Sequence, residues 1–150
     1  MATYTSYLNL EKPAVGETFN LLKINQNWDK IDQGVSSLNS KSSNVLQVSN
    51  ISANVSNVSA TYEKVGKVAL IHVSATCNQQ IPVGSNISCN ITGLHIYGNS
   101  HGSGYAGDTA GVLALSKAGD DSISALIRIV GSPLISGYTI SCTAPIVVNE

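Results

Sequence analysis

Apolar residues recur at roughly helical spacing near the start of the chain. The positions in this stripe are Phe19, Leu22, Ile24, Trp28, Ile31 and Val35. Their spacing predicts an amphipathic helix over about residues 18–34, with Thr18 as its N-cap and with Gly34 weakening or ending it. A helix of this size is marginal when alone in water, so the stripe predicts a packing partner.

The spacing of the apolar residues changes after the predicted helix. The polar segment SSLNSKSSN, residues 36–44, is typical of a linker or a neck. In residues 45–62, the last apolar positions fit the a/d spacing of a coiled coil. Ser, Asn and Val are poor helix formers, and the segment lacks the Glu and Lys of coiled-coil flanks. Extended chain is therefore favoured, at least from Val55 onward, with a helical neck as the alternative.

From Tyr62 the pattern predicts only β-strands. In VALIHVSATC, residues 68–77, every second side chain is small or apolar, which predicts one core face. That face consists of Ala69, Ile71, Val73, Ala75 and Cys77. Further strands are predicted in ISCNITGL, in GVLALSKAGDDSISALIRIVG with a turn at residues 118–121, and in TISCTAPIVV.

Strands that recur roughly every 8–12 residues, with Gly, Asn and Asp in the turns, predict a mainly β fold. We expect a short N-terminal helix followed by an antiparallel, jelly-roll-like β-sandwich. The expected domains are an N-terminal segment, residues 1–44, and a sandwich head, residues 45–150. Residues 45–61 form a neck in one interpretation.

The charge, the apolar runs and the cysteine content of the chain exclude several classes of function. The chain has 150 residues and a net charge of −1, and Arg128 is its only arginine, which argues against nucleic-acid binding. No apolar run approaches the ~20 residues that span a bilayer, and MATYTSYLNLEKP does not resemble a secretion signal. We therefore expect cytoplasmic synthesis and no membrane insertion.

Three widely spaced cysteines, Cys77, Cys89 and Cys142, favour buried thiols over a disulfide framework or a metal site.

No catalytic constellation is evident in the sequence. The HGSG tetrapeptide at residues 101–104 lacks the strand-to-helix context of a nucleophile elbow. Asp120 and Asp121 are adjacent in a predicted turn, where turn chemistry explains them. We expect no enzymatic activity, no metal and no cofactor.

The Gly-rich segment HIYGNSHGSGYAGDTA, residues 95–110, is predicted to be a long loop and is the best binding candidate. Saccharide recognition requires aromatic faces for the C–H surface of the sugar and polar groups for its hydroxyls. The candidate residues are His95, Tyr97, Asn99, His101, Tyr105 and Asp108. A connection without a ligand is the alternative. Tyr62 and Tyr138 are expected to belong to the sandwich.

Several segments of the chain resemble segments of a known class of proteins. LNLEKPAVGETFNLLKINQNWDKID, where an L.KP..GE stretch precedes a helix with N.N.D.ID, resembles the N-terminal segment of tail-fibre and baseplate proteins of tailed bacteriophages. YEKVGKVALIHVSA and GVLALSKAGDDSISALI are similar to hairpins in the head domains of phage receptor-binding proteins. The LP.G..P motif usual after the second strand is only faintly present as NITGL.

The resemblance implies a homotrimer at the tail tip of a virion, synthesised in the cytoplasm of a bacterial host. Its N-terminal segment would attach to a tail or baseplate protein, and the apolar stripe of the helix would form the attachment or trimer interface. Its head would adhere to host cell-wall or surface polysaccharide without catalysis. The alternative is a purely structural tail or baseplate component that contacts only virion proteins.

Overall fold

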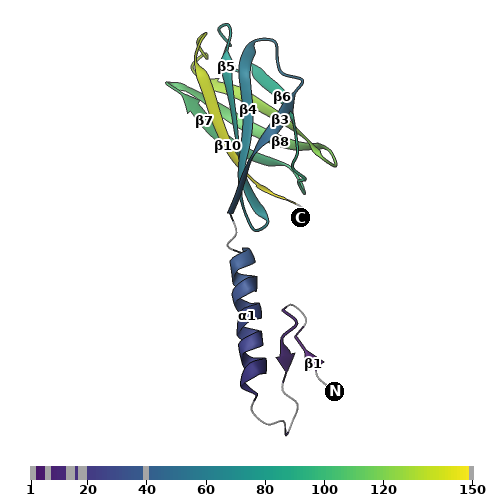
Figure 1. Cartoon of the computed structure of the whole chain (residues 1–150). Coiled ribbons are helices and arrows are strands. Elements are labelled where there is room, and N and C mark those ends of the chain that lie inside the picture. The colour runs from purple at the N-terminus through teal and green to yellow at the C-terminus, as the bar shows by residue number, and fades with distance from the viewer. Residues whose placement is uncertain (1–2, 6–7, 13–15, 17–19, 39–40, 149–150) are drawn as a thin grey trace. The chain divides into compact units, whose positions relative to one another are not determined.

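The computed structural model describes residues 3–5, 8–12, 16, 20–38 and 41–148. The chain forms two compact units, Met1–Ser40 and Lys41–Glu150 (Figure 1). The boundary lies where the second unit's first strand begins, at Lys41. The boundary falls inside the segment predicted as a linker or a neck, residues 36–44, although helix extends to Leu38 and strand begins at Lys41. Residues 39–40 lie outside the described residues.

The N-terminal unit combines a short hairpin with one helix. Strands β1 (Thr3–Tyr4) and β2 (Glu11–Lys12) pair antiparallel, and the helix α1 spans Leu21–Leu38. The N-cap is Asn20, whose Oδ1 accepts hydrogen bonds from the backbone N–H groups of Leu22 and Lys23 at 3.1 and 3.3 Å. Thr18, the predicted N-cap, and Phe19 lie outside the described residues.

Gly34 does not end the helix, which continues through Leu38. A Cβ atom at this position would lie 2.9 Å from Cδ2 of Leu8. The glycine leaves room for the end of the side chain of Leu8, which precedes β2.

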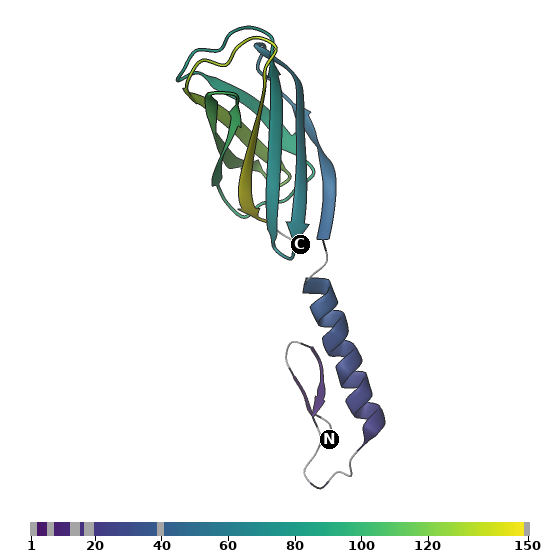
Figure 2. The ribbon, with the colours of Figure 1, turned by 90° about the vertical axis from the view of Figure 1, so that its left-hand side faces the viewer.

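The second unit is a closed antiparallel β-barrel (Figure 2). Its strands are β3 (Lys41–Ser49), β4 (Val55–Val65), β5 (Val68–Cys77), β6 (Asn86–Thr92), β7 (Ser100–Ala106), β8 (Thr109–Gly119), β9 (Ser122–Gly131) and β10 (Thr139–Val147). Around the barrel they follow the order β10-β5-β4-β3-β6-β9-β8-β7. The predicted extended conformation from Val55 onward is confirmed, as is the predicted turn at residues 118–121, which joins β8 to β9.

The predicted sandwich is wrong because both seams of the sheet are closed. Residues 47–49 of β3 pair with β6, and residues 103–105 of β7 pair with β10. The inner face of β7 carries Gly102 and Gly104, where a Cβ would overlap the carbonyl oxygens of Thr143 and Ser141. Strand glycines of this kind allow another backbone to approach closely. The same glycines explain why the predicted loop at 95–110 is wrong: most of it is strand.

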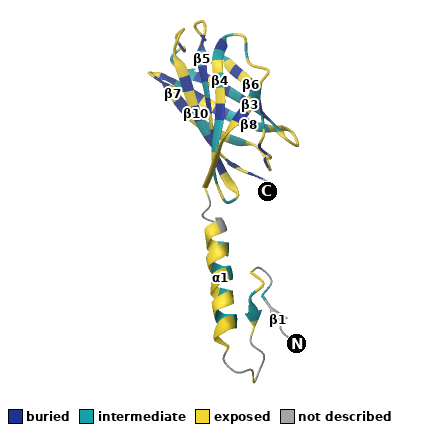
Figure 3. Ribbon diagram, in the orientation of Figure 1, coloured by how far each residue is buried: buried dark blue, intermediate teal, exposed yellow. Residues whose placement is uncertain are grey.

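The core fills the interior of the barrel (Figure 3). The predicted inner face of β5 is confirmed, since alternate residues from Ala69 to Cys77 are buried.

The three cysteines are free and buried, as predicted. Burial raises the pKa of the Cys89 and Cys142 thiols to about 11. Among the described residues, no helix is long and apolar enough to cross a membrane.

Candidate ligand site and attachment helix

The antiparallel topology gives the barrel two ends, which carry different connections. At one end, here called the loop end, the connections are residues 50–54, 78–85, 107–108 and 132–138. At the other, here called the hairpin end, they are residues 66–67, 93–99 and 120–121. This division separates the six predicted saccharide-binding residues.

His95, Tyr97 and Asn99 lie at the hairpin end. Nδ1 of His95 donates to the backbone carbonyl of Asp120 at 2.6 Å, and its Nε2 lies 3.6 Å from Oδ1 of Asp121. Oδ1 of Asn99 accepts from the backbone N–H of Lys117 at 3.3 Å. His95 and Asn99 thus fasten the β6–β7 connection to the β8–β9 hairpin, and their polar atoms are engaged in structure.

Tyr105 and Asp108 lie towards the loop end. His101 is between the two groups, on the outer face of β7 and opposite Ala114 of β8. Seven residues of extended chain span roughly 20 Å, so β7 separates the groups by more than the length of one sugar ring. The six residues do not form one site.

A hollow of about 390 Å³ opens at the loop end. Its lining residues are Gln80, Ala106, Gly107, Asp108, Thr109, Ser132, Pro133, Ile135 and Tyr138. Tyr138 is 50% exposed, and a Cβ on Gly107 would lie 3.7 Å from its Cε2 atom. One aromatic ring, one carboxylate and one amide therefore border the same space, which is the composition expected of a site for a polar ligand.

Backbone and side-chain hydrogen bonds hold the rim of this hollow. Ile81 and Leu134 exchange N–H···O bonds of 2.9 and 3.0 Å, which join the β5–β6 connection to the β9–β10 connection. Thr109, the buried polar residue of the barrel among those described, donates from Oγ1 to the carbonyl of Pro133 at 2.9 Å. Ser136 Oγ donates to the carbonyl of Asn78 at 2.9 Å. The site is thus largely formed before any ligand binds.

A larger hollow, of about 570 Å³, lies towards the hairpin end. It is lined by Lys41, Ser42, Ser43, Glu63, Lys64, Val65, Val68 and Leu70. These residues include no aromatic ring, and the three apolar side chains are exposed on adjacent strands. Exposed apolar side chains rimmed by polar residues are typical of protein contacts, and without an aromatic ring this hollow has no stacking face for a sugar. We therefore take the loop-end hollow as the candidate ligand site.

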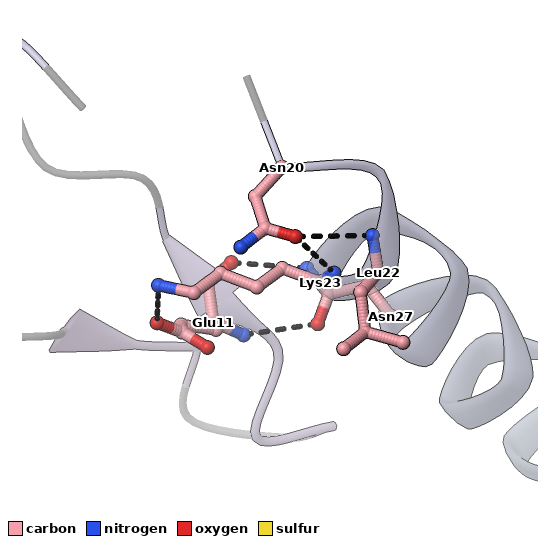
Figure 4. Close-up of polar contacts among 5 residues, drawn as sticks. All are labelled: Glu11, Asn20, Leu22, Lys23 and Asn27. Atoms are coloured by element: carbon pink, nitrogen blue, oxygen red, sulfur yellow. Dashed lines mark hydrogen bonds and ion pairs between the residues drawn. The ribbon is translucent and has the colours of Figure 1, made fainter. Parts of the chain in front are cut away.

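In the N-terminal unit, the polar side chains of one helix face hold the hairpin (Figure 4). Asn27 accepts at Oδ1 from the backbone N–H of Glu11 at 3.1 Å, and its Nδ2 donates to the carbonyl of Glu11 at 3.0 Å. Lys23 Nζ lies 2.6 Å from Oε1 of Glu11, and Lys30 Nζ donates to the carbonyl of Asn9 at 2.8 Å.

The apolar stripe lies on a different face of the helix. Trp28 is 61% exposed and Val35 is exposed, while Ile24 and Ile31 are half-buried. Leu22 does not belong to the stripe, because at about 100° per residue it points away from Ile31 on the opposite side of the helix. The stripe predicted from spacing is therefore correct for Ile24, Trp28, Ile31 and Val35, wrong for Leu22, and outside the described residues for Phe19.

Of the residues that line the loop-end hollow, only Asp108 is among the ligand candidates predicted from the sequence. The polar and aromatic lining residues that lie outside residues 95–110, and that were not predicted, are Gln80, Ser132 and Tyr138. Tyr62 and Tyr138 are both predicted to belong to the sandwich; Tyr62 packs against the core, whereas Tyr138 lines the hollow. The signal in the sequence is position, because Tyr138 directly follows the dipeptide Ser136-Gly137, which is typical of a turn. In the structure Gly137 has a φ of +84°. Within the described part of the chain, no group of three or more His, Cys, Asp and Glu side chains could hold a metal ion.

Comparisons with known proteins give little further information. No protein-family model and no curated protein matches the chain. Among solved structures, the chain is similar to the C-terminal receptor-binding domain of the avian reovirus fibre protein sigmaC. The identity is 7% and the TM-score is 0.41, over 71% of this chain and 75% of that chain. A similarity this low establishes neither a shared family nor a shared function. The resemblance to tailed-phage proteins thus rests on the sequence segments alone.

Proposed function

We propose that the protein is a phage tail-tip attachment protein that binds saccharide on the host cell surface without catalysis. The observation that carries the proposal is the loop-end hollow, where Tyr138, Asp108 and Gln80 border one pre-formed space. A separate N-terminal unit with an exposed apolar stripe supports attachment to a virion protein. The sequence segments that resemble phage fibre proteins support a location in a tail or baseplate.

We further propose that the protein is a homotrimer. A weak sugar site gains avidity when several copies bind one cell surface, so three barrels per particle would strengthen adhesion without any new contact. The solution mass of the full chain, from light scattering after size exclusion, tests this part. A mass of three chains is expected, and a monomer at micromolar concentration would contradict it.

Cell binding tests the adhesive function. Fluorescently labelled full-length protein is incubated with a panel of Gram-positive and Gram-negative bacteria, each with and without periodate oxidation of its surface sugars. We expect binding to some strains and its loss after periodate treatment. Release of new reducing ends from the surface polysaccharide would contradict the non-catalytic part.

The alternative, a purely structural baseplate component, predicts a different outcome. The observation that favours it is the larger hollow at the hairpin end, where Val65, Val68 and Leu70 are exposed on the adjacent strands β4 and β5, since exposed apolar patches are typical of protein contacts. In that case the labelled protein would bind purified virion proteins and would bind no cell in the panel.

A further inference from the structure

We propose that the loop-end hollow selects uncharged saccharides and rejects anionic ones, with Tyr138 as the stacking surface and Asp108 as the main hydroxyl acceptor. This inference rests on the proposed function, because it names the ligand class of the same site. It separates neutral cell-surface polysaccharides from acidic ones such as uronic-acid polymers and phosphate-containing polymers.

The first step of the argument is the stacking surface. Tyr138 is half exposed and lies in the hollow's lining, next to the β7–β8 turn. That turn has Gly107 at φ +59°, so no side chain from residue 107 stands over the ring. About half of the Tyr138 side chain is therefore accessible from the hollow's side of the barrel end, and this exposed aromatic surface can receive the C–H face of a pyranose.

The second step is hydrogen bonding. Asp108 is exposed and follows Gly107 directly in the turn. An ionised carboxylate only accepts hydrogen bonds and has two oxygens, so it can hold two adjacent sugar hydroxyls. Gln80 and Ser132, which can both donate and accept, border the same hollow. A sugar can thus satisfy its donors and its acceptors within one site.

The third step is charge. Asp108 is the one charged side chain among the residues that line the hollow. The barrel's lysines lie towards the hairpin end, at positions 41, 64, 67 and 117. Arg128 is on the outer face of β9, paired with Val112 and Asn86, and is not part of the lining. A carboxylate or phosphate in the hollow would face Asp108 without a compensating cation, which opposes its binding.

The experiment uses full-length protein and polysaccharide released from a strain that the labelled protein binds. Anion-exchange chromatography separates this material into a neutral and an acidic fraction, and calorimetry measures the affinity for each. We expect at least tenfold tighter binding to the neutral fraction. Tyr138→Ala should weaken binding at least tenfold, Tyr138→Phe should bind like the unmodified chain, and Asp108→Asn should weaken binding several-fold. Asp108→Lys should move the preference towards the acidic fraction.

Tyr97→Ala is the matched control, because Tyr97 is 66% exposed and lies at the opposite end of the barrel. It should leave binding unchanged. The inference is overturned if Asp108→Asn and Tyr138→Ala bind like the unmodified chain, if the acidic fraction binds more tightly, or if Tyr97→Ala alone abolishes binding. In these three cases the proposed adhesion stands. If the unmodified chain binds no cell and neither fraction, both proposals fail.

Discussion

The carbonyl oxygen of Ser141 occupies the place where a side chain on Gly104 would begin. Gly102 has the same relationship to the carbonyl of Thr143. Gly111, on the adjacent strand β8, completes the glycine cluster, since its Cβ would lie 2.7 Å from Cδ1 of Ile140. The β7–β10 seam can close only because these inner positions carry no side chain.

Gly104→Ala should therefore destabilise the barrel. Overpacking typically costs about 1–3 kcal/mol, and we expect the upper part of that range, because backbone rather than a flexible side chain must move. Denaturant unfolding of the full chain measures the effect. The control is Gly98→Ala, where nothing lies within 4 Å of the added Cβ. Equal stability of the two variants would show that the seam tolerates a side chain.

The buried thiols of Cys89 and Cys142 make stability depend on alkaline pH. Burial raises their pKa from 9.0 to about 11 in the folded chain. Between these values the unfolded chain has lost protons that the folded chain keeps, so the free energy of unfolding falls as pH rises from about 9 to about 11. Denaturant midpoints at pH 8 and pH 10.5 measure the fall. Cys89→Ala should show a smaller fall, and an unchanged pH dependence would contradict this account.

Asn27 should be more important to the N-terminal unit than Asn25. Asn27→Ala removes two hydrogen bonds to the backbone of Glu11, each worth about 1 kcal/mol, and a two-stranded hairpin is marginal without packing. We expect faster hydrogen exchange at the amide of Thr5, which bonds to Leu10 within the hairpin. Asn25→Ala, at an exposed helix position, should leave that exchange rate unchanged. Equal rates in both variants would mean that the helix does not hold the hairpin.

Trp28 and Leu22 form a matched pair for the proposed trimer. They are 61% and 66% exposed but lie about 120° apart around the helix. Trp28→Ala should leave the stability of the single chain within about 0.5 kcal/mol and should weaken self-association at least tenfold, since buried tryptophans dominate interfaces. Leu22→Ala should change neither. Light scattering over a dilution series measures both, and stronger dissociation of Leu22→Ala would place the interface on the other side of the helix.

Local patterns in the sequence predict individual elements well. The alternation from Ala69 to Cys77 identifies the inner face of β5, because a half-buried strand leaves a period of two in its side chains. The same period cannot distinguish a sandwich from a barrel, since both bury alternate residues. The difference lies in whether β7 meets β10, a pairing between residues far apart in the chain.

The candidate site was harder to predict for the same reason. The Gly-rich composition of GSGYAG is shared by loops and by barrel strands, so composition alone predicts a loop where the structure has β7. A loop would bring residues close in sequence into one site, whereas β7 places Tyr97 and Tyr105 towards opposite ends of the barrel. Tyr138 borders Gly107 only through the folded arrangement of two distant connections. Leu22 differs from these cases, because the sequence alone is enough to exclude it from the apolar stripe. Helical geometry of about 100° per residue places Leu22 on the side of the helix opposite Ile31.

The position of β10 between β5 and β7 has a consequence for biosynthesis. β5 and β7 are both translated before β10, and each must wait for it to complete its pairing. Unpaired strand edges are templates for association with other chains. While the ribosome is still making the barrel, two edges therefore remain open, and crowding of several nascent chains on one messenger RNA would expose them to each other until Thr139–Val147 emerges.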